Sequence, residues 1–402
     1  MTRQRLLTRR DLLIWTGAFA LVAVLIVATG FTSDDPDSAL YAGLSARLAQ
    51  EPASRWIAPE WWGFWPEAQM SGLFREHPAG VLLMPAALTR VGIPAAQGAY
   101  LVGIAAGLAS LLLIGVLANR VVPRDEARAA LVLLQLMPVA FIFRIRANHE
   151  YPMLLCLLVA LWGLSAVRRS WAAGLAAVAG AMAAALLVKG VFVLLVLIGA
   201  ALWLLLNPLR EAARPLRPWI AFAAGLAAMI VVALAYDAWY VRVTGETFWL
   251  PYWRRQLGPV SIASPIDDAW SLTRNFLFYV SRLIWHPAPW SIALAVAVWR
   301  ARGWRRGGWH AAPASARSVV FVLAFALLSI LVLTPSSRFA ERYAFSATYV
   351  VAAAGAVAAF RLWPRVRRSV AALDAAIPAL PAMVWLLAMV LRLVSGPLLP
   401  RL

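Results

Sequence analysis

Long apolar segments separated by short polar turns are the feature that most constrains how this chain can fold. Such segments recur from residues 12–31 to 370–394, and several approach the roughly 20 residues that a helix needs to cross a bilayer. Hydrophobic residues make up 63% of the chain, against about half in a soluble globular domain. The pattern therefore predicts an all-α polytopic membrane protein.

The charged residues follow the pattern that sets membrane topology. The net charge is +19, but the arginines lie in short clusters between apolar segments, as they do in loops that stay in the cytoplasm. We therefore exclude nucleic acid as a partner and expect Arg3, Arg5, Arg9 and Arg10 to hold the N-terminus in the cytoplasm. Segment 12–31 follows a start that resembles a twin-arginine signal, but it lacks a convincing cleavage site, so we interpret it as an uncleaved first transmembrane helix.

The apolar run 80–91 decides the rest of the topology. It is shorter than a spanning helix, and the later arginine clusters fall on the cytoplasmic side only if it does not cross. We therefore expect a re-entrant or interfacial helix here, inside a first periplasmic loop over 32–94. Besides 12–31, the expected spans lie near 95–118, 127–143, 153–167, 172–188, 191–206, 219–239, 276–299, 319–333, 344–360 and 370–394.

These segments predict one transmembrane domain over 1–402, with about eleven or twelve spanning helices. We expect the C-terminus on the periplasmic side and no separate soluble domain after the last span. Kinks are expected at Pro138, Pro287 and Pro289, because proline removes a helical hydrogen bond and clashes with the preceding turn.

The acidic stretch after the first span has the features of a helix start. Asp35 precedes Pro36, which predicts an N-cap followed by proline at the first helical position. Asp37 then falls in the first turn, where the helix dipole favours a carboxylate. Leu40, Leu44 and Leu48 follow at helical spacing, so we expect an amphipathic helix in the membrane interface, with Ser38, Ser45 and other polar residues off the apolar stripe.

Asp37 and Glu150 are the candidate pair of catalytic carboxylates, because the expected topology brings both to the periplasmic face. One carboxylate can remove the proton of an acceptor hydroxyl, and a second can orient the acceptor or hold a cation. Each has an alternative interpretation. Asp37 could serve only to cap the helix, and Glu150 could form a local ion pair with Arg144 or Arg146.

Lys189 is the only lysine of the chain and lies between two apolar runs. An ionisable group at such a position is costly and usually faces a cavity or a partner. Its functional interpretation is a cation for a phosphate at the membrane surface; the alternative is a side chain that extends to the interface. Further candidate phosphate ligands are Arg144, Arg146, Arg338 and Arg342.

His77, which precedes Pro78, could bind a phosphate, a carboxylate or a metal, although a single interfacial histidine is more often structural. We predict no set of metal ligands, and a possible divalent metal is left open. Cys156 is the only cysteine, which excludes disulfides and cysteine-based metal sites. The chain contains no Walker loop or dinucleotide-binding glycine motif, so any activated donor should be membrane-borne.

Several short motifs occur in order along the chain. Residues 37–41, Asp-Ser-Ala-Leu-Tyr, resemble an Asp-Glu-x-x-Tyr signature; residues 76–79, Glu-His-Pro-Ala, are similar to a His-Pro-Pro segment; and residues 187–190, Leu-Val-Lys-Gly, resemble a Thr-Lys-Gly turn. Later landmarks are Glu150, 289–291 and 342–343. Together these motifs resemble those of the C-type (GT-C) membrane glycosyltransferases, which include dolichyl-phosphate-mannose protein mannosyltransferases and bacterial lipid A aminoarabinose transferases.

This resemblance implies a GT-C fold and an inverting transfer of a sugar from a polyprenyl-phosphate carrier to an acceptor hydroxyl on the periplasmic face of the bacterial inner membrane. By the same resemblance, Asp37 is the general base and Glu150 a second acidic group. Tyr41, His77, Lys189 and Arg342 lie among the expected substrate-binding residues.

The motifs depart from the family pattern at Ser38, Ala79 and Glu150, where the family has an acid, a proline and an aspartate. These departures, with the expected lack of the outer soluble domain that many relatives carry, leave the acceptor open among lipid, glycan and protein. The expected partners are a polyprenyl-phosphate-linked sugar, membrane lipids and that acceptor. A transporter or flippase for lipid-linked saccharides is the main alternative, although no internal repeat supports it; a catalytically silent scaffold is a third.

Overall fold

The computed structural model describes residues 35–61, 72–135, 146–209, 216–257, 269–300, 313–336 and 340–376, together with residues 137, 139, 143, 386 and 390. In these ranges every regular element is a helix, apart from one isolated β-bridge between Glu60 and Leu73. The predicted all-α class is therefore confirmed. The expected first span, 12–31, and most of the last one lie outside the described residues.

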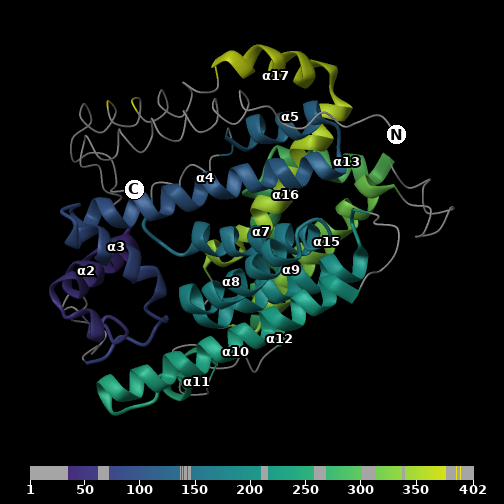
Figure 1. Cartoon of the computed structure of the whole chain (residues 1–402). Coiled ribbons are helices and arrows are strands. Elements are labelled where there is room, and N and C mark those ends of the chain that lie inside the picture. The colour runs from purple at the N-terminus through teal and green to yellow at the C-terminus, as the bar shows by residue number, and fades with distance from the viewer. Residues whose placement is uncertain are drawn as a thin grey trace.

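The helices form a bundle with α2 and α3 at one end of the view and α13 at the other (Figure 1). In the described ranges, three short 3₁₀ turns accompany them: η1 (Ala53–Arg55), η3 (Gly190–Phe192) and η5 (Glu341–Ala344). The α-helices are α2 (Pro36–Gln50), α3 (Gly80–Arg90), α4 (Ala95–Val121), α5 (Arg124–Gln135), α7 (Glu150–Ala166), α8 (Trp171–Lys189), α9 (Val193–Leu206), α10 (Leu216–Thr244), α11 (Trp249–Leu257), α12 (Ala269–Trp285), α13 (Trp290–Arg300), α15 (Ala314–Leu333), α16 (Phe345–Leu362) and α17 (Pro364–Ala376).

Five apolar segments in the described part are long enough to cross a membrane by length and composition: Gln97–Val121, Trp171–Leu206, Leu216–Thr244, Ala314–Leu333 and Glu341–Leu362. The expected span 276–299 is divided into α12 and α13, and the break contains Pro287 and Pro289. The kinks expected at these prolines are therefore present as an interruption of the helix.

The run 80–91 forms the short helix α3. Its 11 residues span about 16 Å at 1.5 Å per residue, which is too short to cross a hydrocarbon core of about 30 Å. Helix α3 packs against α2, α4 and α8. A Cβ atom at Gly80 would lie 2.5 Å from the carbonyl oxygen of Leu187, so this glycine allows the close approach to α8.

Helix α2 begins as the sequence predicts, but its apolar stripe has a different role. Asp35 is the N-cap and accepts the backbone N–H of Ser38. Leu40, Leu44 and Leu48 are buried in a cluster that also contains Phe74, Leu82 and Ala86. The stripe therefore packs against other parts of the protein, unlike the lipid-facing stripe of an interfacial helix. Ser38 and Ser45, expected off the stripe, are also fully buried.

The turn after α8 reverses the chain, so that α8 and α9 both lie along α7. Gly174 near the start of α8 contacts Val167 after the end of α7, whereas Gly199 of α9 contacts Leu157 in the middle of α7. Small residues allow helices in membranes to approach closely. This packing brings the first residue of α7, Glu150, beside the last residue of α8, Lys189.

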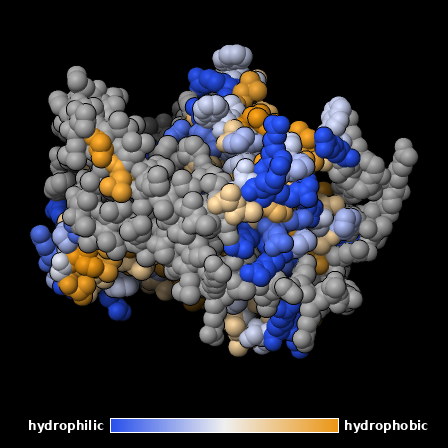
Figure 2. All heavy atoms as spheres, turned by 90° about the horizontal axis from the view of Figure 1, so that it is seen from above, coloured by the Kyte–Doolittle hydropathy of each residue, from blue (hydrophilic) through white to orange (hydrophobic). Residues whose placement is uncertain are grey.

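The opposite end of the bundle is rich in arginine. Arg120 at the end of α4 donates to Ser165 at the end of α7, and Arg361 at the end of α16 pairs with Glu126 at the start of α5. Figure 2 views the molecule from the side on which α17 lies in Figure 1, and many hydrophilic side chains gather on this face. The cationic end and the end that carries Glu150 and Lys189 are thus distinct.

Two glycines of α8 test the packing of this bundle. A Cβ atom at Gly174 would lie 2.6 Å from the backbone nitrogen of Val167, whereas a Cβ at Gly180 would meet no other described segment within 4 Å. We expect Gly174→Ala to lower the free energy of unfolding by about 1–3 kcal/mol through overpacking. Gly180→Ala should raise it by up to about 1 kcal/mol, because alanine favours helix. Thermal unfolding of both detergent-purified variants measures the contrast, and equal midpoints would contradict the packing at Gly174.

Candidate active site

Four charged side chains from distant parts of the sequence meet at the end of the bundle where α2 and α7 begin and α8 ends. They are Asp37 in the first turn of α2, Glu150 at the start of α7, Lys189 at the end of α8 and Arg342 in η5. The sequence predicted all four as site residues. Their contacts form a chain of alternating charges that runs from Asp37 to Lys189.

Glu150 and Lys189 form a buried ion pair. Lys189 Nζ lies 2.9 Å from Glu150 Oε1, and the two side chains are 4% and 1% exposed. The ammonium group also lies 4.6 Å from the ring centre of Phe192 and 5.1 Å from that of Tyr343, within cation–π distance. Lys189 therefore does not extend to the interface as the alternative interpretation supposed.

Arg342 lies between the two carboxylates. Its Nη1 donates to Asp37 Oδ2, and its Nε lies 4.0 Å from Glu150 Oε1. The Asp37 side chain is 25% exposed, whereas that of Glu150 is 1% exposed. Of the two carboxylates, only Asp37 is accessible to a group that approaches from outside the protein.

Asp35 and Arg146 lie together at the start of α2. Asp35 accepts both the N–H and the hydroxyl of Ser38 and lies 3.8 Å from Arg146 Nε. The backbone N–H of Ala147 in turn donates to Ser38 Oγ at 2.9 Å. Asp35 therefore caps the helix, and the Asp37 carboxylate is directed to Arg342. Arg146 pairs with Asp35 rather than with Glu150.

Tyr41, His77 and His149 form an aromatic cluster beside Glu150. The ring centre of His149 lies 4.5 Å from that of Tyr41 and 4.5 Å from that of His77. Burial, together with the charge of Glu150, raises the pKa of Tyr41 well above its ordinary value. Burial lowers the pKa of His149, with smaller contributions from His77 and Lys189. Both side chains are therefore neutral near pH 7.

Orphaned polar atoms mark this region. In the described part of the chain, His149 Nε2 and Glu150 Oε2 are buried and have no hydrogen-bond partner. Buried polar atoms are usually paired, so such exceptions often accompany a function. Among the described residues, no group of three or more His, Cys, Asp or Glu side chains is placed to hold a metal ion.

Some contacts in the site could not have been found from local sequence signals. His149 was missed, although its position next to Glu150 offered a hint. Glu76 is held by Arg255 and Gln256 of α11, and Tyr343 lies beside Lys189; neither contact has a local sequence signal. Arg144 and Arg338, both predicted phosphate ligands, lie outside the described residues.

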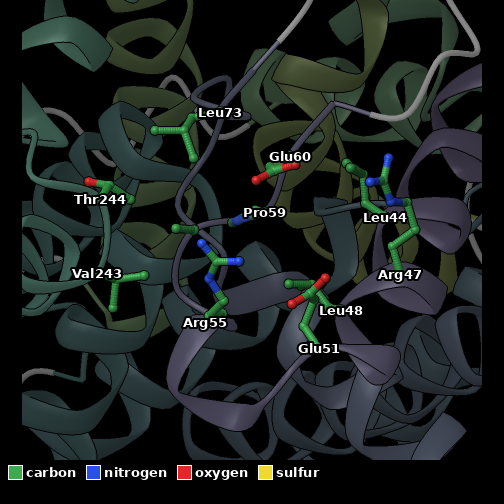
Figure 3. A pocket seen from close by; sticks show the side chains of 11 residues that line it. Leu44, Arg47, Leu48, Glu51, Arg55, Pro59, Glu60, Leu73, Val243 and Thr244 are labelled. Atoms are coloured by element: carbon green, nitrogen blue, oxygen red, sulfur yellow. The ribbon is translucent and has the colours of Figure 1, made fainter.

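The described helices of the bundle line a small pocket and a larger cavity. A pocket of about 220 Å³ is lined by Leu44 and Arg47 of α2 on one side and by Val243 and Thr244 of α10 on the other, as Figure 3 shows. A larger cavity of about 670 Å³ is lined mainly by apolar side chains of α4, α13, α15 and α16. Its lining suits a hydrocarbon chain.

Solved structures define the class of fold. The chain is similar to ArnT from Cupriavidus metallidurans bound to undecaprenyl phosphate, with a TM-score of 0.65 and 16% identity over 89% of this chain and 62% of ArnT. For the apo state of ArnT the TM-score is 0.63, with 17% identity over 89% and 61% of the two chains. The chain therefore has a fold similar to the GT-C fold of ArnT, which confirms the fold expected from the motifs. This chain spans about three fifths of the length of ArnT.

A family model also matches part of the chain. Residues 76–236 match the family described as dolichyl-phosphate-mannose-protein mannosyltransferase. This range includes His77, Glu150 and Lys189, whereas Asp37 and Arg342 lie outside it. The search of curated proteins found no match to the sequence.

A double-mutant cycle tests the buried pair. Glu150→Gln leaves the Lys189 ammonium group buried without its carboxylate, and we expect a loss of about 3–5 kcal/mol in the free energy of unfolding. Lys189→Met should also destabilise the protein. The double variant should lose clearly less than the sum of the two single variants, because it removes both charges. Unfolding in detergent measures all four proteins, and additive losses would contradict the coupling.

Proposed function

We propose that this protein is an inverting glycosyltransferase that moves a sugar from a polyprenyl-phosphate carrier to an acceptor hydroxyl. The observation that carries the proposal is the accessible carboxylate of Asp37, which lies in one charged chain with Arg342, Glu150 and Lys189. A general base next to cations that can hold a phosphate is the arrangement that this transfer requires.

Asp37 is assigned as the general base in this mechanism. Its carboxylate accepts the proton of the acceptor hydroxyl as that oxygen attacks the anomeric carbon, and the bond from that carbon to the phosphate oxygen breaks. Attack from the side opposite to the phosphate inverts the configuration. Arg342 and Lys189 stabilise the negative charge that the phosphate leaving group gains. Glu150 holds both cations in place.

The donor is assigned to the membrane. The apolar cavity between α4, α13, α15 and α16 extends to Arg361 at the arginine-rich end of the bundle, so it offers space for the part of a hydrocarbon chain that lies far from the phosphate. The similar protein ArnT was crystallised with undecaprenyl phosphate. A prenyl chain that enters from the bilayer leaves an environment that is already apolar, so the cavity would contribute van der Waals packing and shape selectivity to donor binding. The acceptor is a lipid, a glycan or a protein with a free hydroxyl.

A transporter for lipid-linked saccharides explains the charged residues less well. Transporters bind their substrates near the middle of the bilayer, whereas Asp37, Glu150, Lys189 and Arg342 lie at the ends of their helices. The position of the charges at one end of the bundle favours chemistry at the membrane surface.

The active site is proposed to face the periplasm from the inner membrane, because the arginine clusters lie at the other end of the bundle. A phosphatase reporter fused after Gly92, which follows α3, should be active in the periplasm. The same reporter fused after Arg169, between α7 and α8, should be inactive. A cytoplasmic readout at Gly92 would contradict the non-spanning assignment of α3.

Substitution of Asp37 tests the mechanism most directly. Asp37→Asn should lower kcat in proteoliposomes supplied with the lipid-linked sugar by about 10²–10⁴-fold, because the amide cannot accept the proton. Expression and thermal stability should stay close to wild type. Glu246→Gln is the matched control, since Glu246 also pairs with an arginine, Arg75, but lies outside the charged chain. Turnover of Asp37→Asn near the wild-type rate would overturn the assignment.

A further inference from the structure

Helix α11 packs on the turn that carries Lys189. Tyr252 of α11 is fully buried, and its hydroxyl oxygen accepts the backbone N–H of Val191 at 2.7 Å. Val191 lies in the 3₁₀ turn η3 that leads into α9. The first N–H groups of a helical segment have no acceptor within the helix, so the Tyr252 hydroxyl acts as the cap of this turn.

The Tyr252 ring also requires glycine at position 190. Gly190 has a φ of +53°, which L side chains rarely adopt. A Cβ atom at this position would lie 2.0 Å from Tyr252 Oη and 2.4 Å from Tyr252 Cζ. The backbone directly after Lys189 is therefore in close contact with Tyr252 through both a hydrogen bond and steric packing.

The same helix holds a second segment of the site. Arg255 forms an ion pair with Glu76, and Gln256 Nε2 donates to the backbone oxygen of Glu76 at 3.0 Å. Glu76 precedes His77, whose ring contacts that of His149. Helix α11 thus fastens two segments that are more than 100 residues apart in the sequence. Burial raises the pKa of Tyr252, so its hydroxyl stays protonated near pH 7.

We infer that Tyr252 is a positioning residue for the lipid phosphate: by fixing the turn at Gly190 and Val191, it holds the Lys189 ammonium group where it contacts both Glu150 and the donor. This inference rests on the proposed function. It assigns to α11 a role in donor affinity, although Tyr252 itself is not placed in contact with the reacting atoms. A purely structural role would leave the affinity for the donor unchanged in folded protein.

Tyr252→Phe removes the hydroxyl and keeps the ring. We expect KM for the polyprenyl-phosphate sugar to rise about tenfold, because release of the turn displaces the Lys189 ammonium group and weakens one charge-assisted contact with the phosphate. KM for the acceptor should stay within about twofold. The dissociation constant of undecaprenyl phosphate, used as the probe without a sugar, should rise by a similar factor. Tyr240→Phe is the matched control, because Tyr240 is buried in the same cluster and also packs on Phe248 but does not contact the turn.

The Lys189→Met background separates positioning from general packing. If Tyr252 acts through Lys189, then Tyr252→Phe should change undecaprenyl phosphate binding by less than twofold once the lysine is absent. An equal loss in both backgrounds, or an equal loss in Tyr240→Phe, would overturn the inference. So would unchanged donor KM and binding in a Tyr252→Phe protein that unfolds at the wild-type temperature.

Failure of the proposed function is distinguishable from failure of this inference. A wild-type protein that binds undecaprenyl phosphate but transfers no sugar would overturn the proposed function, while the binding cycle would still decide the role of Tyr252. A wild-type protein that transfers sugar, with no Lys189-dependent effect of Tyr252→Phe, would overturn only the positioning role.

Discussion

The buried ion pair between Glu150 and Lys189 is the interaction on which the rest of the site depends. Two charges removed from water are costly to bury, and they are tolerated only when each satisfies the other. The pair forms because α7 and α8 approach closely along small residues such as Gly163 and Gly174, and because the chain reverses at Gly190. Helix packing and charge pairing therefore require each other: the packing brings the charges together, and an unpaired charge would oppose the packing.

The parts of this site that the sequence predicts are those with a strong local signal. Pro36 at the first helical position identified the cap at Asp35 and placed Asp37 in the first turn, directly after the proline. A single lysine between two apolar runs identified Lys189. In each case one residue type at one position has few physical explanations, so the sequence alone limits the choice. The interruption of the helix at Pro287 and Pro289 was predictable for the same reason.

The parts that the sequence does not predict depend on which distant residues become neighbours. Arg146 was a candidate partner of Glu150 and a candidate phosphate ligand, and its ion pair with Asp35 was not foreseen. The stripe of Leu40, Leu44 and Leu48 looked like a lipid-facing surface, but Phe74, Leu82 and Ala86 cover it. An amphipathic pattern states only that a face is apolar; whether lipid or protein covers that face is decided by tertiary packing. The contact of Tyr252 with Val191, 61 residues apart, is of the same kind.

The exposure of the side chains falls along the charged chain. This decrease suits the proposed transfer of a sugar from a membrane-borne donor to an acceptor that arrives from outside the protein. Asp37 is 25% exposed and Glu150 is 1% exposed, and Arg342 lies between them. In the proposed mechanism, an acceptor that arrives from outside would meet the accessible carboxylate first, whereas Lys189 would act from a low-dielectric setting where its attraction to an anion is stronger. A base must exchange its proton with the surroundings after each turnover, and a cation that stabilises a leaving group works best away from water. The difference in burial along one charged chain meets both requirements.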